Sequence, residues 1–233
     1  MKSIIKEIAK DVWQIPLFPR NGVNAYIVEG YLVDAGIRSS GKKILKAIDQ
    51  YGRDNIKGHV LTHAHADHQG ASAFICDTLQ IPLWCGENDV AAMESGQVTS
   101  EFPNPNHPVA RFQRRFWAGP KYKVSRALKE GDQVGQFNVL ETPGHSAGHI
   151  ALWRESDGLI IAGDVLVNMN MNTTITQLGE PPGMFTTDVR ENRASIRKLA
   201  NLHPKLICFG HGEPLYKTEQ LAVLVSKIGK GSK

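Results

Sequence analysis

The chain has 233 residues, of which 41% are hydrophobic and 21% are charged, and its formal net charge is +4. This composition is typical of an ordinary globular protein and excludes an intrinsically disordered chain. We expect a single domain over 1–233 with a sizeable core, although the length alone would also permit two domains. The small positive charge favours anionic substrates but is too diffuse to indicate a nucleic-acid partner by itself.

The sequence also bears on where the protein acts. Charged residues interrupt 1–20, so the apolar core of a signal peptide is missing there, and no apolar stretch is long enough to span a membrane. Cys76, Cys85 and Cys208 are widely spaced in apolar contexts, which predicts buried free thiols. We therefore expect a cytoplasmic protein with no membrane partner. The pattern carries no information on oligomeric state.

Short strands and helices alternate in the N-terminal half. Residues 24–29 and 31–34 predict a tight hairpin joined at Gly30, and 41–51 predicts an amphipathic helix that Gly52 ends. The expected elements that follow are a buried strand over 59–62, a helix over 71–79, a strand over 81–85 and a helix that begins over 88–93.

The regular pattern breaks down over 97–121, where prolines surround a segment of cations and aromatic residues, Arg111–Trp117. This segment could be an amphipathic helix with Phe112 and Phe116 packed on the body, or a nucleic-acid contact. We favour a lid or wall over a functional cleft, because long irregular stretches in compact domains are usually functional. The same interpretation holds for 167–186, whose methionines and phenylalanine indicate a partly apolar substrate.

The C-terminal half contains more strands and two helices. Expected strands cover 122–124, 137–140, 150–153, 159–162 and 206–209, and expected helices cover 188–202 and 217–228. Asp188 is a candidate N-cap for the first of these helices, with Ile196 and Leu199 facing inward. We expect the tail, 229–233, to be frayed.

Four side chains of the kind that bind metals lie between His63 and His68. A strand would place His63, His65 and Asp67 on one face and His68 on the other. A helix would separate His65 from His63. A turn around a central object lets all four converge, and imidazole nitrogen and carboxylate oxygen are ligands of zinc and related ions. Three further candidates, each after an apolar run and beside a glycine, are His145, Asp164 and His211.

Taken together and in this order, the motifs His-x-His-x-Asp-His, Pro-Gly-His, Gly-Asp and Gly-His-Gly resemble the metallo-β-lactamase superfamily over nearly the whole chain. The resemblance implies an α+β fold, a four-layer αββα sandwich of two mixed β-sheets flanked by helices, with the metal site in loops at one edge. It also implies two divalent metal ions, zinc in the first place and iron or manganese as alternatives. Their ligands would be His63, His65 and His145 for one ion, Asp67, His68 and His211 for the other, and Asp164 as the bridge.

Such a centre would activate water for hydrolysis, and Asp67 is the candidate catalytic residue because it could orient the water or accept its proton. An aspartate at position 164 resembles the thioesterase, lactonase, phosphodiesterase and ribonuclease branches of the family. The zinc β-lactamases place Cys or Ser there. Oxygen-reducing di-iron relatives carry Glu at the position of His65, which disfavours redox chemistry here.

We therefore favour a hydrolase of a small ester, thioester or lactone. Two subtypes fit imperfectly. Glyoxalase II enzymes carry a helical C-terminal domain for which the residues after His211 are too few, and lactonases often place a tyrosine just after the bridging aspartate, where Val165 stands. A ribonuclease or phosphodiesterase is an alternative motivated by Arg111, Arg114 and Arg115, although no glycine-rich arm that would grip tRNA is present. A non-hydrolytic di-iron protein or scaffold is the third hypothesis.

Five other polar residues have less certain roles in the pattern. By the resemblance, Asp34 would support the metal loop through hydrogen bonds. His149 could support the centre from outside or could be an ordinary buried histidine. We expect His59 and His203 to be structural, and His107 to be a loop histidine that could face the cleft.

Overall fold

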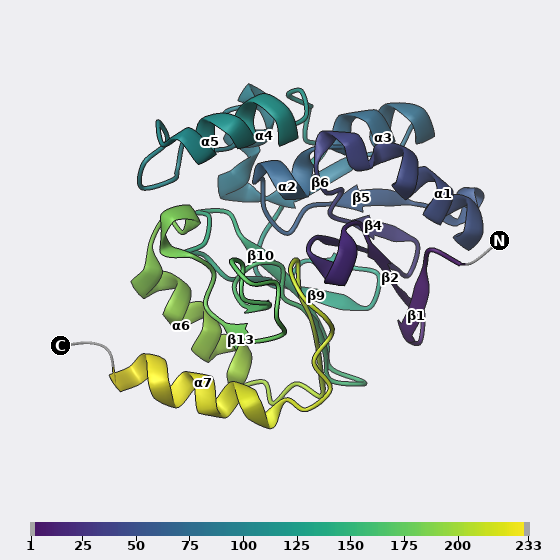
Figure 1. The fold of residues 1–233 in the computed structure, drawn as a ribbon. Coiled ribbons are helices and arrows are strands. Elements are labelled where there is room, and N and C mark those ends of the chain that lie inside the picture. The colour runs from purple at the N-terminus through teal and green to yellow at the C-terminus, as the bar shows by residue number, and fades with distance from the viewer. Residues whose placement is uncertain (1–2, 231–233) are drawn as a thin grey trace.

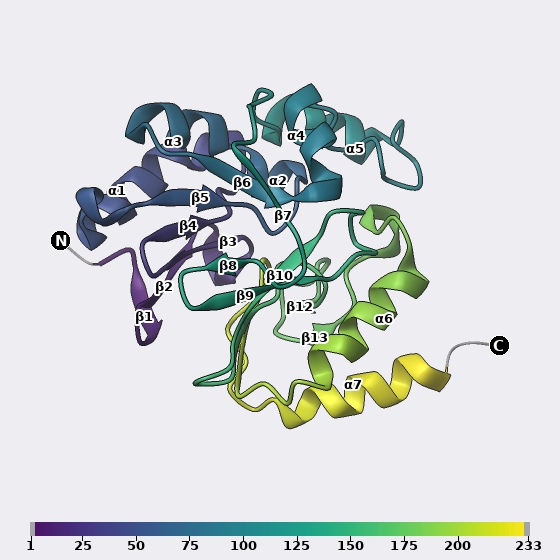
Figure 2. The same ribbon diagram turned by 180° about the vertical axis from the view of Figure 1, so that it is seen from behind.

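Two β-sheets lie face to face, and helices cover their outer surfaces (Figures 1 and 2). The computed structural model describes residues 3–230. Part of the predicted frayed tail, 231–233, lies outside this range, whereas 229–230 continue the final helix. The layers confirm the predicted α+β fold with its four-layer αββα arrangement.

The first sheet has seven strands that follow one another in chain order. They are β1 (Lys6–Ala9), β2 (Val12–Pro16), β3 (Asn24–Val28), β4 (Tyr31–Val33), β5 (Gly58–Val60), β6 (Leu83–Gly86) and β7 (Arg126–Leu128). Strands β1 to β4 pair antiparallel and β4 to β7 pair parallel. Parallel strands need crossover connections, and helices supply them. These helices are α1 (Gly41–Tyr51), α2 (Ala66–Gln69), α3 (Ser72–Leu79), α4 (Val90–Ser95) and α5 (Pro108–Phe112).

The second sheet has five strands in the order β14-β11-β10-β9-β8. Its strands are β8 (Gln133–Val134), β9 (Phe137–Glu141), β10 (Ile150–Arg154), β11 (Leu159–Ile161) and β14 (Leu206–Cys208). Strand β10 is antiparallel to both β9 and β11, and β14 is parallel to β11. Helices α6 (Val189–Ala200) and α7 (Glu219–Lys230) cover its outer face, and β12 (Val167–Asn168) pairs with β13 (Leu178–Gly179) in a small third sheet.

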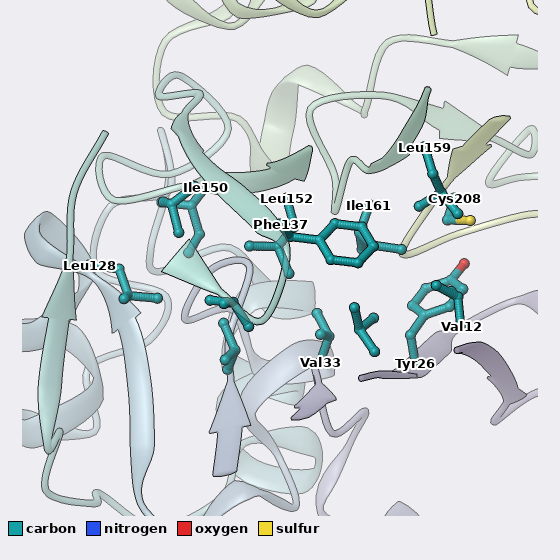
Figure 3. Close-up of a cluster of buried hydrophobic side chains, with 14 of the residues drawn as sticks. Val12, Tyr26, Val33, Leu128, Phe137, Ile150, Leu152, Leu159, Ile161 and Cys208 are labelled. Carbon is teal, nitrogen blue, oxygen red and sulfur yellow. The ribbon is translucent and has the colours of Figure 1, made fainter. Parts of the chain in front are cut away.

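Separate apolar clusters join the layers. Between the sheets, Tyr26 and Val33 of the first sheet meet Phe137 and Leu152 of the second (Figure 3). A second cluster joins the first sheet to α1 and α3, and a third joins the second sheet to α6 and α7. Strands β3, β10, β11 and β14 are buried along their whole length and are mostly apolar, because both faces of each sheet are covered there.

Most predicted elements are present at nearly the predicted positions. The hairpin of β3 and β4 turns through Glu29 and Gly30, both at positive φ (51° and 87°), as a two-residue turn requires. Helix α1 has the predicted bounds. Asp188 caps α6 by accepting a hydrogen bond from the Glu191 N–H at 2.9 Å. The three cysteines are buried and free.

Two predictions about local structure are wrong. Residues 122–124 form no strand, because their backbone bonds to the helix before them: Tyr122 N–H donates to the Met93 carbonyl and Val124 N–H to the Glu94 carboxylate. Pairing with β6 begins only at Arg126. The stretch 97–121 is not wholly irregular, since it contains α5 and the π-helical turn η5 (Gln113–Trp117).

An ion-pair cluster joins the two sheets at the turn between β3 and β4. The buried Arg154 guanidinium donates to Glu29 at 3.0 Å and to Asp157 at 2.7 Å, and it lies 4.7 Å from the centre of the Phe137 ring. It also donates to the Lys10 carbonyl at 2.9 Å. Every part of this side chain therefore has a partner, which a buried charge requires. None of the helices in the described part of the chain is long and apolar enough to cross a membrane.

We expect Arg154→Met to lower the free energy of unfolding by about 3 kcal/mol, because the Glu29 carboxylate would stay nearly buried without its partner. Denaturant unfolding of the metal-free protein measures this change. Arg193→Met is the matched control, since its partner Glu180 is more exposed, and its effect should stay below about 1 kcal/mol. Equal losses in the two variants would contradict the assigned role of Arg154.

Candidate metal centre

The candidate ligands all follow strand ends at one edge of the two sheets. Strands β9, β11 and β14 run in the same direction, so the loops after them meet at the same edge. They deliver His145, Asp164 and His211. The end of β5 joins them because the Ile150 N–H, at the start of β10, donates to the Thr62 carbonyl at 2.8 Å.

The cluster between His63 and His68 is a loop followed by a short helix. His65 is the N-cap of α2, and Asp67 and His68 lie in the first turn of that helix. Neither a continuous strand nor a continuous helix is present, as the sequence analysis expected. The change of backbone direction at His65 lets all four side chains face inward.

The structure brings all seven predicted site residues together. The candidate ligands form three overlapping groups, and within each group the ligand atoms lie within 4.8 Å of one another. The groups are His63/His65/His145, His63/His68/Asp164 and Asp67/His68/His211. Asp164 lies between the outer two groups. Its Oδ2 atom is 3.4 Å from His68 Nε2, 3.0 Å from His211 Nε2 and 3.8 Å from His145 Nε2.

Four of the five histidines are held from outside in the same way. Each directs Nδ1 at a fixed partner and Nε2 at the centre, an orientation typical of metal-binding histidines. The Nδ1 partners are Thr62 Oγ1 for His63, the Asp34 carboxylate for His68, Thr186 Oγ1 for His145 and the Gly22 carbonyl for His211. His65 differs, because its Nδ1 atom lies 3.0 Å from His145 Nε2.

Several inward donor atoms have no hydrogen-bond partner in the described residues although they are buried. They are His63 Nε2, His65 Nε2, His68 Nε2 and Asp164 Oδ1. Buried polar atoms are normally paired, and an unmet group needs an explanation such as an ion. Imidazole nitrogen and carboxylate oxygen are the atoms that divalent transition metals bind. The residues present therefore fit a metal centre.

The first group consists of neutral imidazoles. Burial removes the water that would stabilise a charged ring, and this lowers the pKa of His65 to about 4 and of His145 to about 3. Burial, together with the neighbouring His68, also holds the pKa of His63 well below its ordinary value. These rings are ready to bind a cation without losing a proton at neutral pH.

The group of Asp67, His68 and His211 contains charged side chains whose charges oppose one another. Burial opposes charge at each residue, but the Asp164 carboxylate raises the pKa of His211 to about 10 and that of His68 well above its ordinary value. Burial likewise opposes charge on Asp67, yet a hydrogen bond from His211 lowers its pKa to about 2. In the absence of an ion, protonated histidines thus supply the positive charge that these carboxylates need.

Asp34 and His149 support the centre. Asp34 accepts hydrogen bonds from the Thr62 N–H and hydroxyl, both at 2.8 Å, and from His68 Nδ1 at 2.9 Å. His149 Nε2 accepts from the Asp164 N–H at 3.0 Å, while its Nδ1 atom is 2.8 Å from Thr142 Oγ1. Asp34 therefore aligns the metal loop as the resemblance implied, and His149 positions the backbone of Asp164.

Asp89 is a supporting residue that the sequence analysis missed. Its buried carboxylate accepts hydrogen bonds from Ala64 N–H at 2.7 Å, Ser146 Oγ at 2.9 Å and Gly148 N–H at 2.8 Å. It thereby ties the loop of His63 and His65 to the loop of His145. Burial raises its pKa to about 6. The only signal in the sequence was a carboxylate three residues after the end of a strand, which is too common to single out.

Gly210 leaves room for the centre. A Cβ atom at this position would lie 2.1 Å from Asp164 Oδ1 and 2.5 Å from His68 Cε1, so every other residue type would displace a candidate ligand. Asn24 holds the same loop from the first sheet, because its amide donates to the Phe209 carbonyl at 3.0 Å and the Gly212 carbonyl at 2.8 Å.

The two stretches proposed as a lid or wall meet beside the centre. Phe102, from 97–121, packs edge-on against His65 with ring centres 4.8 Å apart, and Phe185, from 167–186, lies 5.4 Å from Phe102. Both stretches therefore contribute apolar side chains to one wall. The alternative in which Phe112 and Phe116 pack on the body does not hold, since 49% and 58% of these residues are exposed.

The remaining histidines lie away from this wall or serve the fold. His59 is buried and bonds to the Leu32 carbonyl and to Ser72 Oγ. His203 lies at positive φ (50°) before Pro204. His107 caps α5, where its ring accepts a hydrogen bond from the Val109 N–H at 3.2 Å.

Comparison with known proteins identifies the family. The sequence matches the model of the metallo-beta-lactamase superfamily over residues 19–211, and the chain belongs to this family. A protein of Bacillus subtilis named "Probable metallo-hydrolase YflN" is 30% identical over 206 residues, which cover 79% of this chain and 75% of that protein. A hydroxyacylglutathione hydrolase of Halorhodospira halophila is 27% identical over 206 residues, with 88% of this chain and 59% of that protein covered.

The fold agrees with solved structures of the family. The crystal structure of TTHA1623 in a di-iron-bound form has a TM-score of 0.66 and 28% sequence identity, and the match covers 87% of this chain and 93% of that one. The chain is thus a member of a superfamily of metallo-hydrolases, and its clustered histidine and aspartate side chains are candidates for binding divalent metal.

We predict that metal affinity in the two groups responds differently to pH. An ion at Asp67/His68/His211 must displace protons from His68 and His211, so its affinity should rise between about pH 6 and about pH 8, by about tenfold per pH unit for each proton released. An ion at His63/His65/His145 displaces none above about pH 5, and its affinity should stay nearly constant. Titration calorimetry with zinc in buffers of different ionisation enthalpy counts the protons. Two ions with the same pH dependence would refute this assignment.

We expect Asp89→Ala to lower the free energy of unfolding by about 3 kcal/mol, because it leaves several buried donors without an acceptor. Asp89→Asn keeps one acceptor oxygen and should cost less. Denaturant unfolding of the metal-free proteins compares the two variants. Wild-type stability in Asp89→Ala would show that the tie between the two loops contributes nothing.

Proposed function

We propose that this protein is a hydrolase of a small ester, thioester or lactone that works with a dinuclear centre of divalent metal ions. His63, His65 and His145 would hold one ion, Asp67, His68 and His211 the other, and Asp164 would bridge them. The observation that carries this proposal is the position of Asp164 Oδ2, which faces histidines of both groups within 3.8 Å. Zinc is the proposed metal, and iron or manganese are the alternatives that metal analysis would identify.

When bound, the ions supply positive charge that lowers the pKa of water toward neutrality and stabilises negative charge on a substrate oxygen. The residues of the chain contribute position and charge. Asp67 is the least buried of the candidate ligands, so it lies nearest to incoming substrate. Its pKa of about 2 keeps it ionised. Asp67 is therefore better suited to accept a hydrogen bond from the attacking water and orient it than to act as a general base that takes up a proton.

The apolar wall of Phe102 and Phe185 beside the centre favours a substrate with an acyl group. Phe102 places an apolar ring next to His65 and Phe185 packs against Phe102, so this wall would exclude water and contact the acyl group. The hydroxyacylglutathione hydrolase relative is named for a thioester substrate, which favours thioesters among the candidate classes. We further propose one domain over 1–233, supported by the apolar cluster shared by both sheets, and a reducing cytoplasmic setting, supported by three buried free cysteines.

Metal removal and restoration test this function. The protein is stripped with a chelator, dialysed and reloaded separately with Zn²⁺, Mn²⁺ or Fe²⁺, and each form is assayed on matched esters, thioesters and lactones. We expect no turnover without metal and restored turnover with at least one ion on at least one class. If no ion restores activity on any class, the hydrolase proposal is wrong. Metal analysis and an absorbance spectrum of the protein as isolated separate zinc from iron.

We expect Asp164→Ala to abolish turnover and to remove at least one ion, because the Asp164 Oδ2 atom faces histidines of both groups. His203→Asn is the control. It removes an imidazole outside the centre at a position of positive φ that asparagine tolerates, so activity and metal content should be those of the wild type. Metal analysis after gel filtration and the assay above measure both effects. Two ions retained by an active Asp164→Ala protein would show that Asp164 is not the bridge.

A further inference from the structure

The helix formed by α5 and η5 presents aromatic side chains to solvent. Phe112 and Phe116 are exposed, and their rings lie 4.9 Å apart. The helix lies at the outside of the N-terminal layer beside α4 (Figures 1 and 2). Exposed aromatic rings that pack on each other are uncommon on a surface that has no partner. We call the side of this helix that carries these rings the Arg–Phe face, which consists of Pro108, Arg111, Phe112, Arg114, Arg115 and Phe116.

The Arg–Phe face borders an open hollow of about 540 Å³, and the only charged side chains that line it are arginines. Arg114 is partly engaged, because it donates to Thr99 Oγ1 at 3.1 Å and to the Pro105 carbonyl at 3.3 Å. Within residues 3–230, no acidic side chain pairs with Arg111 or Arg115. Arg115 lies over the Phe116 ring at 5.7 Å. Two unpaired guanidinium groups beside exposed rings fit an anion that also carries a flat or apolar group.

The Arg–Phe face is joined to the metal centre by Trp117. The Trp117 ring packs against an apolar cluster that contains Ala66, the residue between His65 and Asp67. On its other side it lies 5.9 Å from the Phe112 ring. Trp117 therefore connects the Arg–Phe face to α2, the helix that carries two candidate metal ligands. A substrate long enough to cover Trp117 could occupy the face and the centre together.

The chemistry of the Arg–Phe face distinguishes among occupants. A second copy that met this face with its own Arg–Phe face would bring arginines against arginines, which charge opposes. Guanidinium groups bind phosphate with paired hydrogen bonds, and nucleotide bases stack on phenylalanine rings. All residues that line the hollow belong to one helix, so a ligand bound there would stay partly exposed to solvent. A ligand with phosphates and an aromatic base satisfies the arginines and the rings at once.

We propose that the Arg–Phe face binds the nucleotide phosphate part of a thioester substrate whose acyl end reaches the metal centre, the chemical class to which coenzyme A thioesters belong. The inference rests on the proposed hydrolase function. In the reaction, water adds to the thioester carbonyl carbon, the carbon–sulfur bond breaks, and the products are a carboxylic acid and the thiol of the carrier. The arginines take no part in these steps and contribute only binding.

Binding is tested first without the reaction. Desulfo-coenzyme A keeps the phosphates and the adenine but lacks the thiol that could bind a metal ion, and its affinity for the metal-loaded protein is measured by titration calorimetry. We expect saturable binding that weakens as salt increases and weakens at least tenfold in the double variant Arg111→Ala/Arg115→Ala. Lys42→Ala/Lys46→Ala removes the same charge from exposed positions of α1 and should bind like the wild type. Thermal unfolding of both variants confirms that they are folded.

Kinetics then separate this inference from the hydrolase proposal. The same acyl group is presented on coenzyme A and on N-acetylcysteamine, which lacks the nucleotide. In Arg111→Ala/Arg115→Ala we expect KM for the coenzyme A thioester to rise at least tenfold relative to KM for the truncated thioester. Turnover of both thioesters with no binding of desulfo-coenzyme A would overturn the nucleotide site and leave the hydrolase proposal standing. Binding through these arginines with no turnover of either thioester would overturn the thioester assignment and leave the nucleotide site standing, and the ester and lactone assays above would then decide the hydrolase proposal.

Two other outcomes would also overturn the nucleotide site. The wild type could bind vesicles of anionic phospholipid through Phe112 and Phe116 while desulfo-coenzyme A fails to compete, which would assign the face to a membrane surface. Alternatively, sedimentation could show a dimer that Phe112→Ser/Phe116→Ser dissociates, which would assign it to a second copy of the chain.

Discussion

The Asp164 carboxylate is the contact on which the centre depends, because a single oxygen faces histidines that come from different parts of the chain. Because the site is buried, positive charge has to compensate that oxygen. Without an ion, protonated His68 and His211 do so, and with an ion the metal would take their place. The buried carboxylate therefore has positive neighbours in both states, which explains how it is tolerated before metal arrives.

The surrounding structure holds this arrangement from several directions. Asp34 and Asp89 are buried carboxylates that fix the two loops carrying the first group of histidines, and Asn24 fixes the loop of His211 from the opposite sheet. Each makes several short hydrogen bonds to backbone or to a ligand. Gly210 contributes by having no side chain, since a Cβ atom would enter the centre. The precision of the site thus comes from residues that would not touch an ion themselves.

The sequence alone was sufficient for most of the fold and for the seven residues that the structure gathers. Alternating apolar runs, Gly30 and Asp188 locate the hairpin and the capped helix because these signals act over a few residues. Residues 122–124 look like a strand, but their backbone donates hydrogen bonds to the Met93 carbonyl and the Glu94 carboxylate of α4. The local sequence pattern does not contain this tertiary contact. Asp89 was missed for the same reason, since its three partners come from two distant loops.

The distribution of the candidate ligands between the sheets has a mechanical consequence. His63, His65, Asp67 and His68 follow a strand of the first sheet, whereas His145, Asp164 and His211 follow strands of the second. Ions bound at this edge would cross-link the two sheets in addition to the apolar cluster and the hydrogen bonds of Asn24 and Asp89 between them, while Arg154 joins the sheets at the turn between β3 and β4. Loading with metal would then suppress sliding of one sheet over the other, and amide hydrogen exchange along β9 and β10 would slow even though neither strand touches an ion.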